Sequence, residues 1–341
     1  MRIKELEQSN YALWDEFVQR HPAATFFHLA GWKTVLEKAF GHNTVFLYAE
    51  ENEKIQGILP LGQVKSLLFG NSLISLPFCV TGGIVAENAK AKIALENAAI
   101  ERANQLNVDY LEMRYEQPVN ADWLNKSDLY VSFKKDIDPD SEQNLLNIPR
   151  KQRAMVRKGI KAGLVSEWDA GVDRLHEAYS QSVHALGTPV FSKHYFQVLK
   201  DVFADNCSVL TITNEGELVA SVMSFYFRDQ VLPYYGGGTT AARSCKGNDF
   251  MYWELMRRSC EQGIKVFDYG RSKAGTGAYS FKKNWGFEPV PLHYEYHLVK
   301  SSELPNVSPT NPKYKMFIDV WKKMPLWMTR LLGPHIVKYT G

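Results

Sequence analysis

Hydrophobic and polar positions alternate in a way that predicts the same order of elements twice along the chain. Each copy has two hairpin strands, an apolar strand that ends at glycines or just before them, a helix and one more strand. The first copy covers residues 45–50, 54–64, 73–78, 89–106 and 110–114, and the second covers residues 208–214, 218–228, 231–235, 248–262 and 266–269. The last strands lead to Arg114 and Arg271, which are 157 residues apart (271 − 114). We expect a tandem α/β repeat; the alternative is two unrelated domains with similar local patterns.

Helical periodicity before each hairpin sets the expected domain limits. Predicted helices precede the first hairpin at 9–18 and 29–40, and the second at 148–162, 172–185 and 193–203. The acidic, proline-containing segment Asp136–Glu142 has the composition of a linker. We therefore predict an N-terminal domain over 1–135, a C-terminal domain over 136–300, and a linker with a helical tail over 301–341, its helix spanning 313–323.

Composition is typical of a globular protein of two ordinary domains. The chain has 341 residues, of which 45% are hydrophobic, and a net charge of +3. Its apolar runs are strand-length, and its first residues lack the apolar segment of a secretory signal. Four dispersed cysteines without a nearby ligand histidine predict reduced thiols and no metal site. We expect a cytoplasmic protein, and the near-neutral charge disfavours a general nucleic-acid binder.

The strongest local motif is a strand that leads into a Gly-rich turn and a short helix over residues 267–287. Its glycines let the backbone approach a ligand closely, and the following helix offers unpaired amides to an acyl or phosphate group. The candidate side chains that crowd this turn are Arg271, Lys273, Tyr279, Lys282 and Lys283. Five such donors favour an anionic guest. The alternative is a loop that needs glycine only for its backbone conformation.

The run from Asp268 through Phe287 resembles the signature of FemAB-related proteins, in particular those found beside exosortase and exopolysaccharide systems. Three other stretches support this resemblance: residues 25–32 with 39–42, residues 148–158, and residues 186–191. The resemblance covers most of the chain. It implies a duplicated GNAT acyltransferase fold, an α/β (α+β) architecture in which each copy has a mixed, mainly antiparallel sheet flanked by helices.

The resemblance also implies transfer of an acyl or aminoacyl group to an amine. The expected donors are acyl-CoA, an acyl carrier protein (acyl-ACP) or aminoacyl-tRNA, with no tightly bound cofactor. A lysine near the reacting carbonyl in such relatives matches Lys282 or Lys283, which the sequence does not separate. Tyr279 joins these candidates, and Asp268 is expected to orient the site because a carboxylate beside Arg271 is a weak base.

A degenerate phosphate site is the second candidate for donor binding. CoA-dependent GNAT enzymes have a Gly-rich loop before the helix that follows the central strand, but here that position keeps one glycine of the pattern. The candidate donor-binding residues are Gly237, Gly238, Arg243, Lys246, Gly247, Gly275 and Gly277. The alternative for the 243–247 segment is an ordinary polar start to a helix.

A basic helix is the candidate acceptor site. Arg150, Arg153 and Arg157 share one helical face, where they could bind the phosphates of a sugar nucleotide, a lipid-linked saccharide or tRNA. Arg271, Lys273 and Tyr235 are the other candidates for substrate binding. A solvated basic face is the alternative.

The tail over 321–332 mixes tryptophans, leucines and cations, so we expect it either to pack on the protein or to contact the inner membrane peripherally. Together these patterns predict a transferase of cell-envelope or exopolysaccharide biosynthesis. The alternatives are a non-catalytic protein that binds a glycan or lipid carrier, and a nucleic-acid binder that uses residues 150–161.

Overall fold

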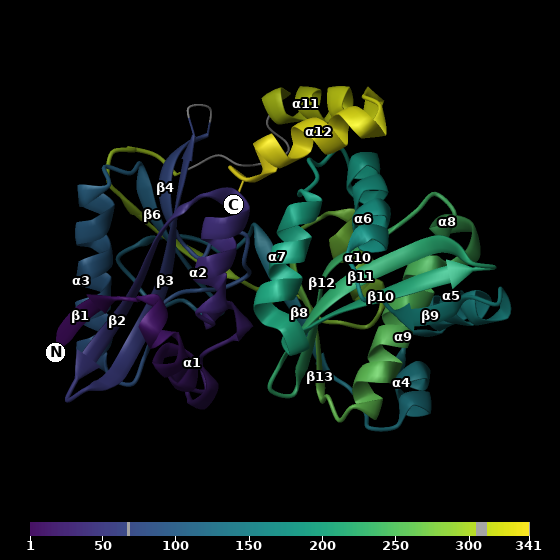
Figure 1. Cartoon of the computed structure of the whole chain (residues 1–341), viewed down its shortest axis with the longest axis horizontal. Helices are drawn as coiled ribbons and strands as arrows, with labels where there is room; N and C mark the ends of the chain where they lie inside the picture. The colour runs from purple at the N-terminus through teal and green to yellow at the C-terminus, as the bar shows by residue number, and fades with distance from the viewer. Residues whose placement is uncertain (67–68, 305–311, 341) are drawn as a thin grey trace. The chain divides into compact units, whose positions relative to one another are not determined.

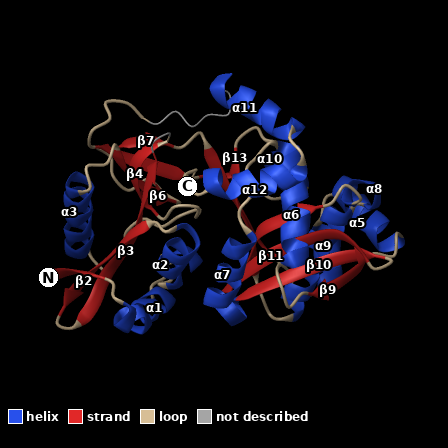
Figure 2. Ribbon diagram, turned by 45° about the horizontal axis from the view of Figure 1, so that its top comes forward, coloured by secondary structure: helices blue, strands red, loops and turns tan. Residues whose placement is uncertain are grey.

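The computed structural model describes residues 1–66, 69–304 and 312–340, and the chain divides into two compact units. Unit 1 comprises Met1–Tyr130, Pro291–Asn306 and Lys338–Gly341, and unit 2 comprises Val131–Val290 and Val307–Val337. Each unit has one sheet with helices packed against it (Figure 1, Figure 2). The predicted α/β (α+β) class is confirmed.

The sheet of unit 1 has eight strands in the order β1-β2-β3-β4-β6-β15-β7, and β5 pairs with β3. Its strands are β1 (Arg2–Glu5), β2 (Asn43–Glu51), β3 (Lys54–Ser66), β4 (Gly70–Ser75), β5 (Val85–Ala86), β6 (Tyr110–Tyr115), β7 (Leu124–Lys126) and β15 (His293–Leu298). Its helices are α1 (Tyr11–Arg20), α2 (Gly31–Val35) and α3 (Ala89–Gln105). The pair β4 and β6 is parallel, whereas the hairpins and the pairs that β15 makes are antiparallel.

The sheet of unit 2 has seven strands in the order β14-β8-β13-β12-β11-β10-β9. Its strands are β8 (Tyr130–Asp136), β9 (Val165–Trp168), β10 (Cys207–Asn214), β11 (Glu217–Phe227), β12 (Gln230–Gly238), β13 (Val266–Lys273) and β14 (Val290–Pro291). Its helices are α4 (Ser141–Asn147), α5 (Arg150–Lys161), α6 (Asp173–Leu186), α7 (Lys193–Phe203), α8 (Ala242–Cys245), α9 (Gly247–Glu261), α10 (Gly277–Asn284), α11 (Pro312–Lys323) and α12 (Leu326–Val337).

The predicted repeat is present as a repeated topology. In unit 1 the hairpin β2–β3 leads to β4, α3 and a parallel β6, and in unit 2 the hairpin β10–β11 leads to β12, α9 and a parallel β13. The ladder between β12 and β13 pairs Gln230 with Val266 and Val231 with Phe267, at the beginning of both strands. The carboxyl ends of these two strands therefore lie beyond the paired positions.

The limits of the two units in the structure differ from the domain limits predicted from the sequence. β8, expected at the end of the first domain, lies beside β13 in the sheet of unit 2, and β15, expected in the second domain, lies beside β6 in the sheet of unit 1. Such pairings join residues far apart in the chain, so no local pattern reveals them. Part of the predicted 301–312 linker, residues 305–311, lies outside the described residues, whereas the predicted tail helix is present as α11.

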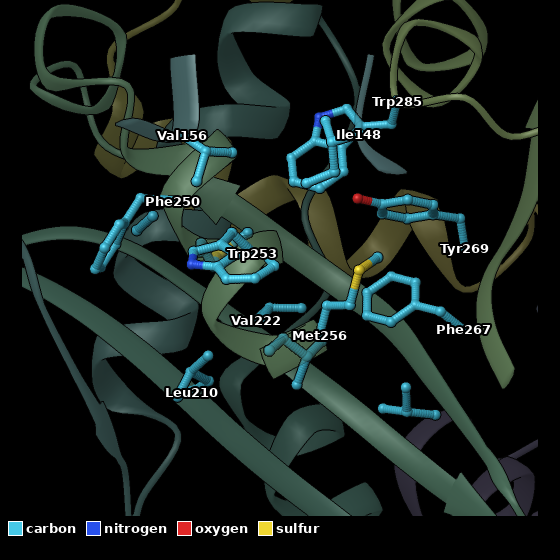
Figure 3. Packing of buried hydrophobic residues seen from close by; sticks show 14 of the residues in the cluster. Ile148, Val156, Leu210, Val222, Phe250, Trp253, Met256, Phe267, Tyr269 and Trp285 are labelled. Carbon is cyan, nitrogen blue, oxygen red and sulfur yellow. The ribbon is translucent and has the colours of Figure 1, made fainter. Parts of the chain in front are cut away.

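The core of unit 2 forms between its sheet and the helices α5 and α9. Phe250, Trp253 and Met256 of α9 pack on strand residues such as Leu210 and Val222, and the cluster extends to Tyr269 and Trp285 (Figure 3). This packing fixes the position of β13 and of the segment that follows it. In the described ranges, no helix combines the length and apolarity needed to cross a membrane.

Candidate active site

Lys282 lies at the centre of the site that the Gly-rich motif forms in unit 2. Its Nζ donates to the carbonyl oxygens of Tyr269 at 2.7 Å, Gly270 at 3.2 Å and Arg271 at 3.0 Å. It also lies 5.6 Å from the centre of the Phe133 ring. An ammonium group has three protons, so these contacts use its whole donor capacity. Lys282 therefore ties α10 to the end of β13.

Burial shifts the titration of Lys282. The pKa of its ammonium is lowered to about 8, chiefly because burial disfavours the charged form; Asp268 opposes this shift and Arg271 adds to it. The group still carries a proton at neutral pH. A buried positive charge with a lowered pKa at the end of a sheet strand is a feature of functional sites.

The turn before α10 is built by side-chain caps. Asp268 is buried, and its Oδ1 accepts a hydrogen bond from the amide of Gly270 at 2.7 Å while Lys134 of β8 lies 3.6 Å from Oδ2. Gly270 has a φ of 62°, which glycine adopts without strain. Thr276 caps α10 by accepting from the amide of Tyr279. The expectation that Asp268 orients the site agrees with these contacts.

The turn leaves open space where a ligand would have to enter. A Cβ atom added at Gly275 or Gly277 would meet no atom within 4 Å. The first amides of α10, at Gly277 and Ala278, precede the first intrahelical hydrogen bond, so they can face an anion or a polarised carbonyl. Backbone amides of this kind are the donors that stabilise an oxyanion.

The other sequence candidates at this motif differ in exposure. Lys283 is exposed, whereas Arg271, Lys273 and Tyr279 are partly exposed, and the Tyr279 ring packs edge-on against Phe133 at 5.6 Å. The structure thus separates the two lysines that the sequence could not. Lys282 is partly buried and its ammonium is bonded to backbone carbonyls, whereas Lys283 reaches solvent.

Asp249 of α9 connects the motif to the basic helix. The indole Nε1 of Trp285 donates to Asp249 Oδ1 at 3.2 Å, and the side-chain amide of Gln152 in α5 donates to the same oxygen. Sequence reasoning missed Asp249, Gln152 and Lys134. An acid in the first turn of a helix is the one signal that could have indicated Asp249.

The basic face of α5 borders a hollow of about 350 Å³, lined by Arg150, Arg153, Ala154, Arg157, Lys158 and Lys161. Among the described residues, none of these cations lies within ion-pair distance of an acid, and Arg153 donates to the carbonyl of Leu146 at 3.1 Å. Val156 and Gly159 of the same helix are buried, the latter against Phe250. The predicted arrangement of Arg150, Arg153 and Arg157 on one face is therefore present.

Several candidates for ligand binding are accounted for by packing. Gly236–Gly238, expected just after a strand, lie within β12; a Cβ at Gly237 would be 2.8 Å from the Ala178 carbonyl oxygen, and one at Gly238 would be 2.6 Å from Ala242 Cβ. A Cβ at Gly247 would overlap Val219. These glycines are needed for close approach of α6, α8 and β11, so the structure gives no reason to place a ligand at them.

Tyr235 is likewise part of a buried aromatic cluster. Its hydroxyl lies 2.7 Å from that of Tyr195, and its ring contacts Tyr179, Phe191 and Phe196. The expectation that Tyr235 binds substrate is therefore not met by its position.

The candidates for donor phosphate differ from Tyr235. Arg243 is exposed, and Lys246, whose φ is 62°, donates from Nζ to the Arg243 carbonyl. Both remain accessible at the start of α9.

Unit 1 has its own hollow of about 300 Å³ at the carboxyl ends of β4 and β6, lined in part by Thr25, His28, Arg114 and Glu116. The His28 Nδ1 accepts from the Thr25 amide at 3.1 Å, so its Nε2 donates to the Gly83 carbonyl at 3.0 Å. Burial lowers the pKa of His28 to about 4 and keeps it neutral. The sequence motif at residues 25–32 did not reveal this hollow, which depends on long-range contacts.

Across the described ranges, no cluster of three or more His, Cys, Asp or Glu side chains is arranged to hold a metal ion. Residues 146–283 match the family model of the acetyltransferase (GNAT) domain. No curated protein sequence matches the chain.

Solved structures resemble the chain over nearly its whole length. FemX aligns with a TM-score of 0.67 at 14% identity and covers 93% of this chain and 100% of its own. The L-PGS structure from Bacillus licheniformis has a TM-score of 0.54 at 13% identity, covering 97% and 99%. A tandem GNAT protein from the clavulanic acid biosynthesis pathway has a TM-score of 0.55 at 11% identity, covering 89% and 99%. Residues 146–283 are thus similar to an acetyltransferase (GNAT) domain, and the chain as a whole has the tandem GNAT fold.

Proposed function

We propose that this protein is a FemAB-like transferase that moves an acyl or aminoacyl group to an amine acceptor at the β13–α10 turn of unit 2. The observation that carries the proposal is the turn between β13 and α10, where Lys282 holds the strand end through backbone carbonyls and open space lies at Gly275 and Gly277. The charge of Lys282 and the first amides of α10 both favour an anion at this turn. The tandem GNAT fold supports the reaction class, and the FemX and L-PGS names support an envelope setting.

The chemistry of such a transfer needs positioning more than a strong base. The lone pair of a neutral amine attacks the carbonyl carbon of an ester or thioester, and the carbonyl oxygen becomes an oxyanion. The oxyanion then re-forms the carbonyl as the bond to the alkoxide or thiolate breaks, and the leaving group takes the proton that the attacking nitrogen loses. The amides of Gly277 and Ala278 would face the oxyanion. Lys282 contributes its charge and holds the strand end, so we assign it as a positioning residue, and Lys283 is the lysine free to contact substrate.

Phosphates on the substrates would bind the basic side of the unit. The face of Arg150, Arg153 and Arg157 suits a sugar nucleotide, a lipid-linked saccharide or a tRNA backbone, since guanidinium groups bind phosphate in a bidentate way. Arg243 and Lys246 would contact donor phosphate at the start of α9. The donor is an acyl-CoA, an acyl-ACP or an aminoacyl-tRNA.

One observation favours a second function, that of a non-catalytic carrier-binding protein. The three protons of Lys282 are all bonded to backbone carbonyls, so the lysine needs no substrate to satisfy it. Under this alternative the turn is a structural element, and the basic face of α5 holds a glycan or lipid carrier for partner enzymes.

The test combines binding and transfer. Purified protein is screened by thermal shift against acetyl-CoA, long-chain acyl-CoA, acyl-ACP, charged and uncharged tRNA and UDP-sugars, and transfer from each stabilising donor is then measured with radiolabel. We expect Lys282→Met to lower the transfer rate on the order of 10²-fold, because the end of β13 loses its anchor and the reacting groups are misplaced, with donor affinity nearly unchanged. Arg153→Ala should weaken phosphate-dependent binding, and its effect should shrink at high salt.

Lys265→Met is the matched control, because Lys265 is an exposed lysine just before the opposite end of β13, so its loss removes the same charge without touching the turn. Transfer by Lys282→Met within threefold of wild type would place the reaction elsewhere. Ligand binding without transfer from any donor would favour the carrier-binding function.

A further inference from the structure

Large apolar side chains are exposed on the two last helices of the chain. Met316 and Val320 of α11 are 69% and 57% exposed, and Trp327 and Leu331 of α12 are 67% and 62% exposed. Each pair is spaced i, i+4, so its members lie on one helix face. Phe317 and Leu332 are also exposed. We refer to these six side chains, with Lys322 and Lys323, as the tail surface.

The same two helices also have a net positive charge. Residues 312–337 contain five Lys or Arg and one acid, Asp319, whereas the rest of the chain contains 35 Lys or Arg and 36 Asp or Glu. Lys322 and Lys323 are exposed and lie between the two apolar pairs in the chain. The two helices therefore combine exposed apolar side chains with an excess of cations.

Other residues hold the helices on unit 2, so the tail surface is not needed for packing. Trp321 is 3% exposed, and the close approach of Gly187 to Ile318 seats α11 on α6. The His184 Nε2 is 2.9 Å from the Met324 carbonyl oxygen, and Arg330 pairs with Glu177 at 2.6 Å. The helices lie together against α6 (Figure 1, Figure 2). They are thus a fixed platform that presents its outer side chains to solvent.

We propose that the tail surface binds the anionic surface of a lipid bilayer. Apolar side chains that include a tryptophan, flanked by lysines, match the boundary between acyl chains and negatively charged headgroups. The charge excess argues for this partner over a second copy of the chain, because two copies would bring like charges together. The inference does not depend on the proposed transfer reaction.

The test is flotation of the full chain with phosphatidylcholine vesicles, with and without phosphatidylglycerol. We expect binding to the anionic vesicles only, decreasing as salt is raised. Trp327→Glu should weaken partition about tenfold or more, since it replaces an exposed aromatic side chain that would be buried in the bilayer interface by a charged one. The double variant Lys322→Glu with Lys323→Glu should weaken it by a similar factor.

Ile93→Glu is the matched control, because Ile93 of α3 in unit 1 is 58% exposed but has no other exposed large apolar side chain on its helix. Its neighbouring lysines, Lys90 and Lys92, contact Glu51 and the Val119 carbonyl. This control variant should bind vesicles as wild type does. Absence of binding to anionic vesicles at low salt overturns the proposal, as does equal weakening by Ile93→Glu. Sedimentation velocity measures self-association of the chain. Self-association that Trp327→Glu abolishes, without vesicle binding, would overturn the proposal and assign the tail surface to a second copy.

Discussion

Replacing Lys282 by methionine tests whether a charged ammonium is buried at the end of β13. Methionine keeps much of the length of the side chain but cannot be protonated. In the folded protein the pKa of Lys282 is about 8, against an ordinary value of 10.5 in the unfolded chain. Between these two pH values the unfolded chain binds more protons than the folded one. The contribution of Lys282 to the free energy of unfolding therefore rises with pH across this window.

The size of the effect follows from the separation of the two pKa values. From pH 7 to pH 10, a group with these pKa values changes the free energy of unfolding by roughly 2–3 kcal/mol. Other lysines and tyrosines also titrate there, so the quantity to measure is the difference between wild type and variant. This difference should move in favour of wild type by roughly 2–3 kcal/mol as the pH rises.

Urea unfolding followed by tryptophan fluorescence at the two pH values measures this difference. Lys283→Met serves as the control, because it removes an exposed lysine from the same helix. A flat difference for Lys282→Met would refute the reasoning, since it would mean that Lys282 titrates alike in both states. A loss of stability that is large but independent of pH would show only that the carbonyl contacts matter.

Two further predictions concern packing and acid sensitivity. Gly237→Ala should destabilise the protein by about 1–3 kcal/mol, because the added Cβ would press on backbone atoms of α6. Gly277→Ala, where the added Cβ faces open space, should change stability by less than about 0.5 kcal/mol. Urea titration of both variants measures these losses, and equal losses would contradict the prediction. His28 has a folded pKa of about 4 against an ordinary 6.5, so acid protonates the unfolded chain first, and its contribution to stability should be lost as the pH falls from 6.5 towards 4. His28→Gln should remove roughly 2–3 kcal/mol of this acid dependence, measured as the free energy of unfolding at the two pH values. If variant and wild type depend on pH in the same way, the imidazole is not buried in its neutral form.

The repeated topology could be predicted from the sequence because each of its helices and strands has a local hydrophobic periodicity. The α3 and α9 helices and the β6 and β13 strands begin within a residue of their predicted positions, since each has a continuous apolar face. β8 and β15 could not be assigned to their sheets, because strand pairing depends on partners far along the chain. The same reason explains why the domain limits differ.

The candidate site was predicted at the level of the motif and less well at the level of single residues. The Gly-rich turn, Asp268 and the two lysines come together as a linear motif must, but which lysine is buried depends on the orientation of α10 against Phe133. Tyr235 and Gly237 have the residue types of binding sites, yet burial gives them packing roles. Residue type alone does not distinguish a glycine that lets a ligand approach the backbone from one that lets a helix pack closely against it.

The two copies of the fold use the arginine near the end of the equivalent strand in opposite ways. In unit 1, Arg114 is buried, and its guanidinium bonds to Glu112 at 2.6 Å and to the carbonyls of Leu76 and Cys79. A guanidinium paired with an acid and with the backbone fixes a loop and has little capacity left for a substrate anion.

In unit 2, Arg271 stays partly exposed, and its own carbonyl is held by Lys282. The strand end is thus secured by a lysine that approaches from α10. Unit 1 has a buried strand-end arginine paired with an acid and with the backbone, whereas unit 2 has a partly exposed one next to a turn with open space at Gly275 and Gly277. This asymmetry is the physical reason to look for the reaction in unit 2 and for a binding role in the hollow of unit 1.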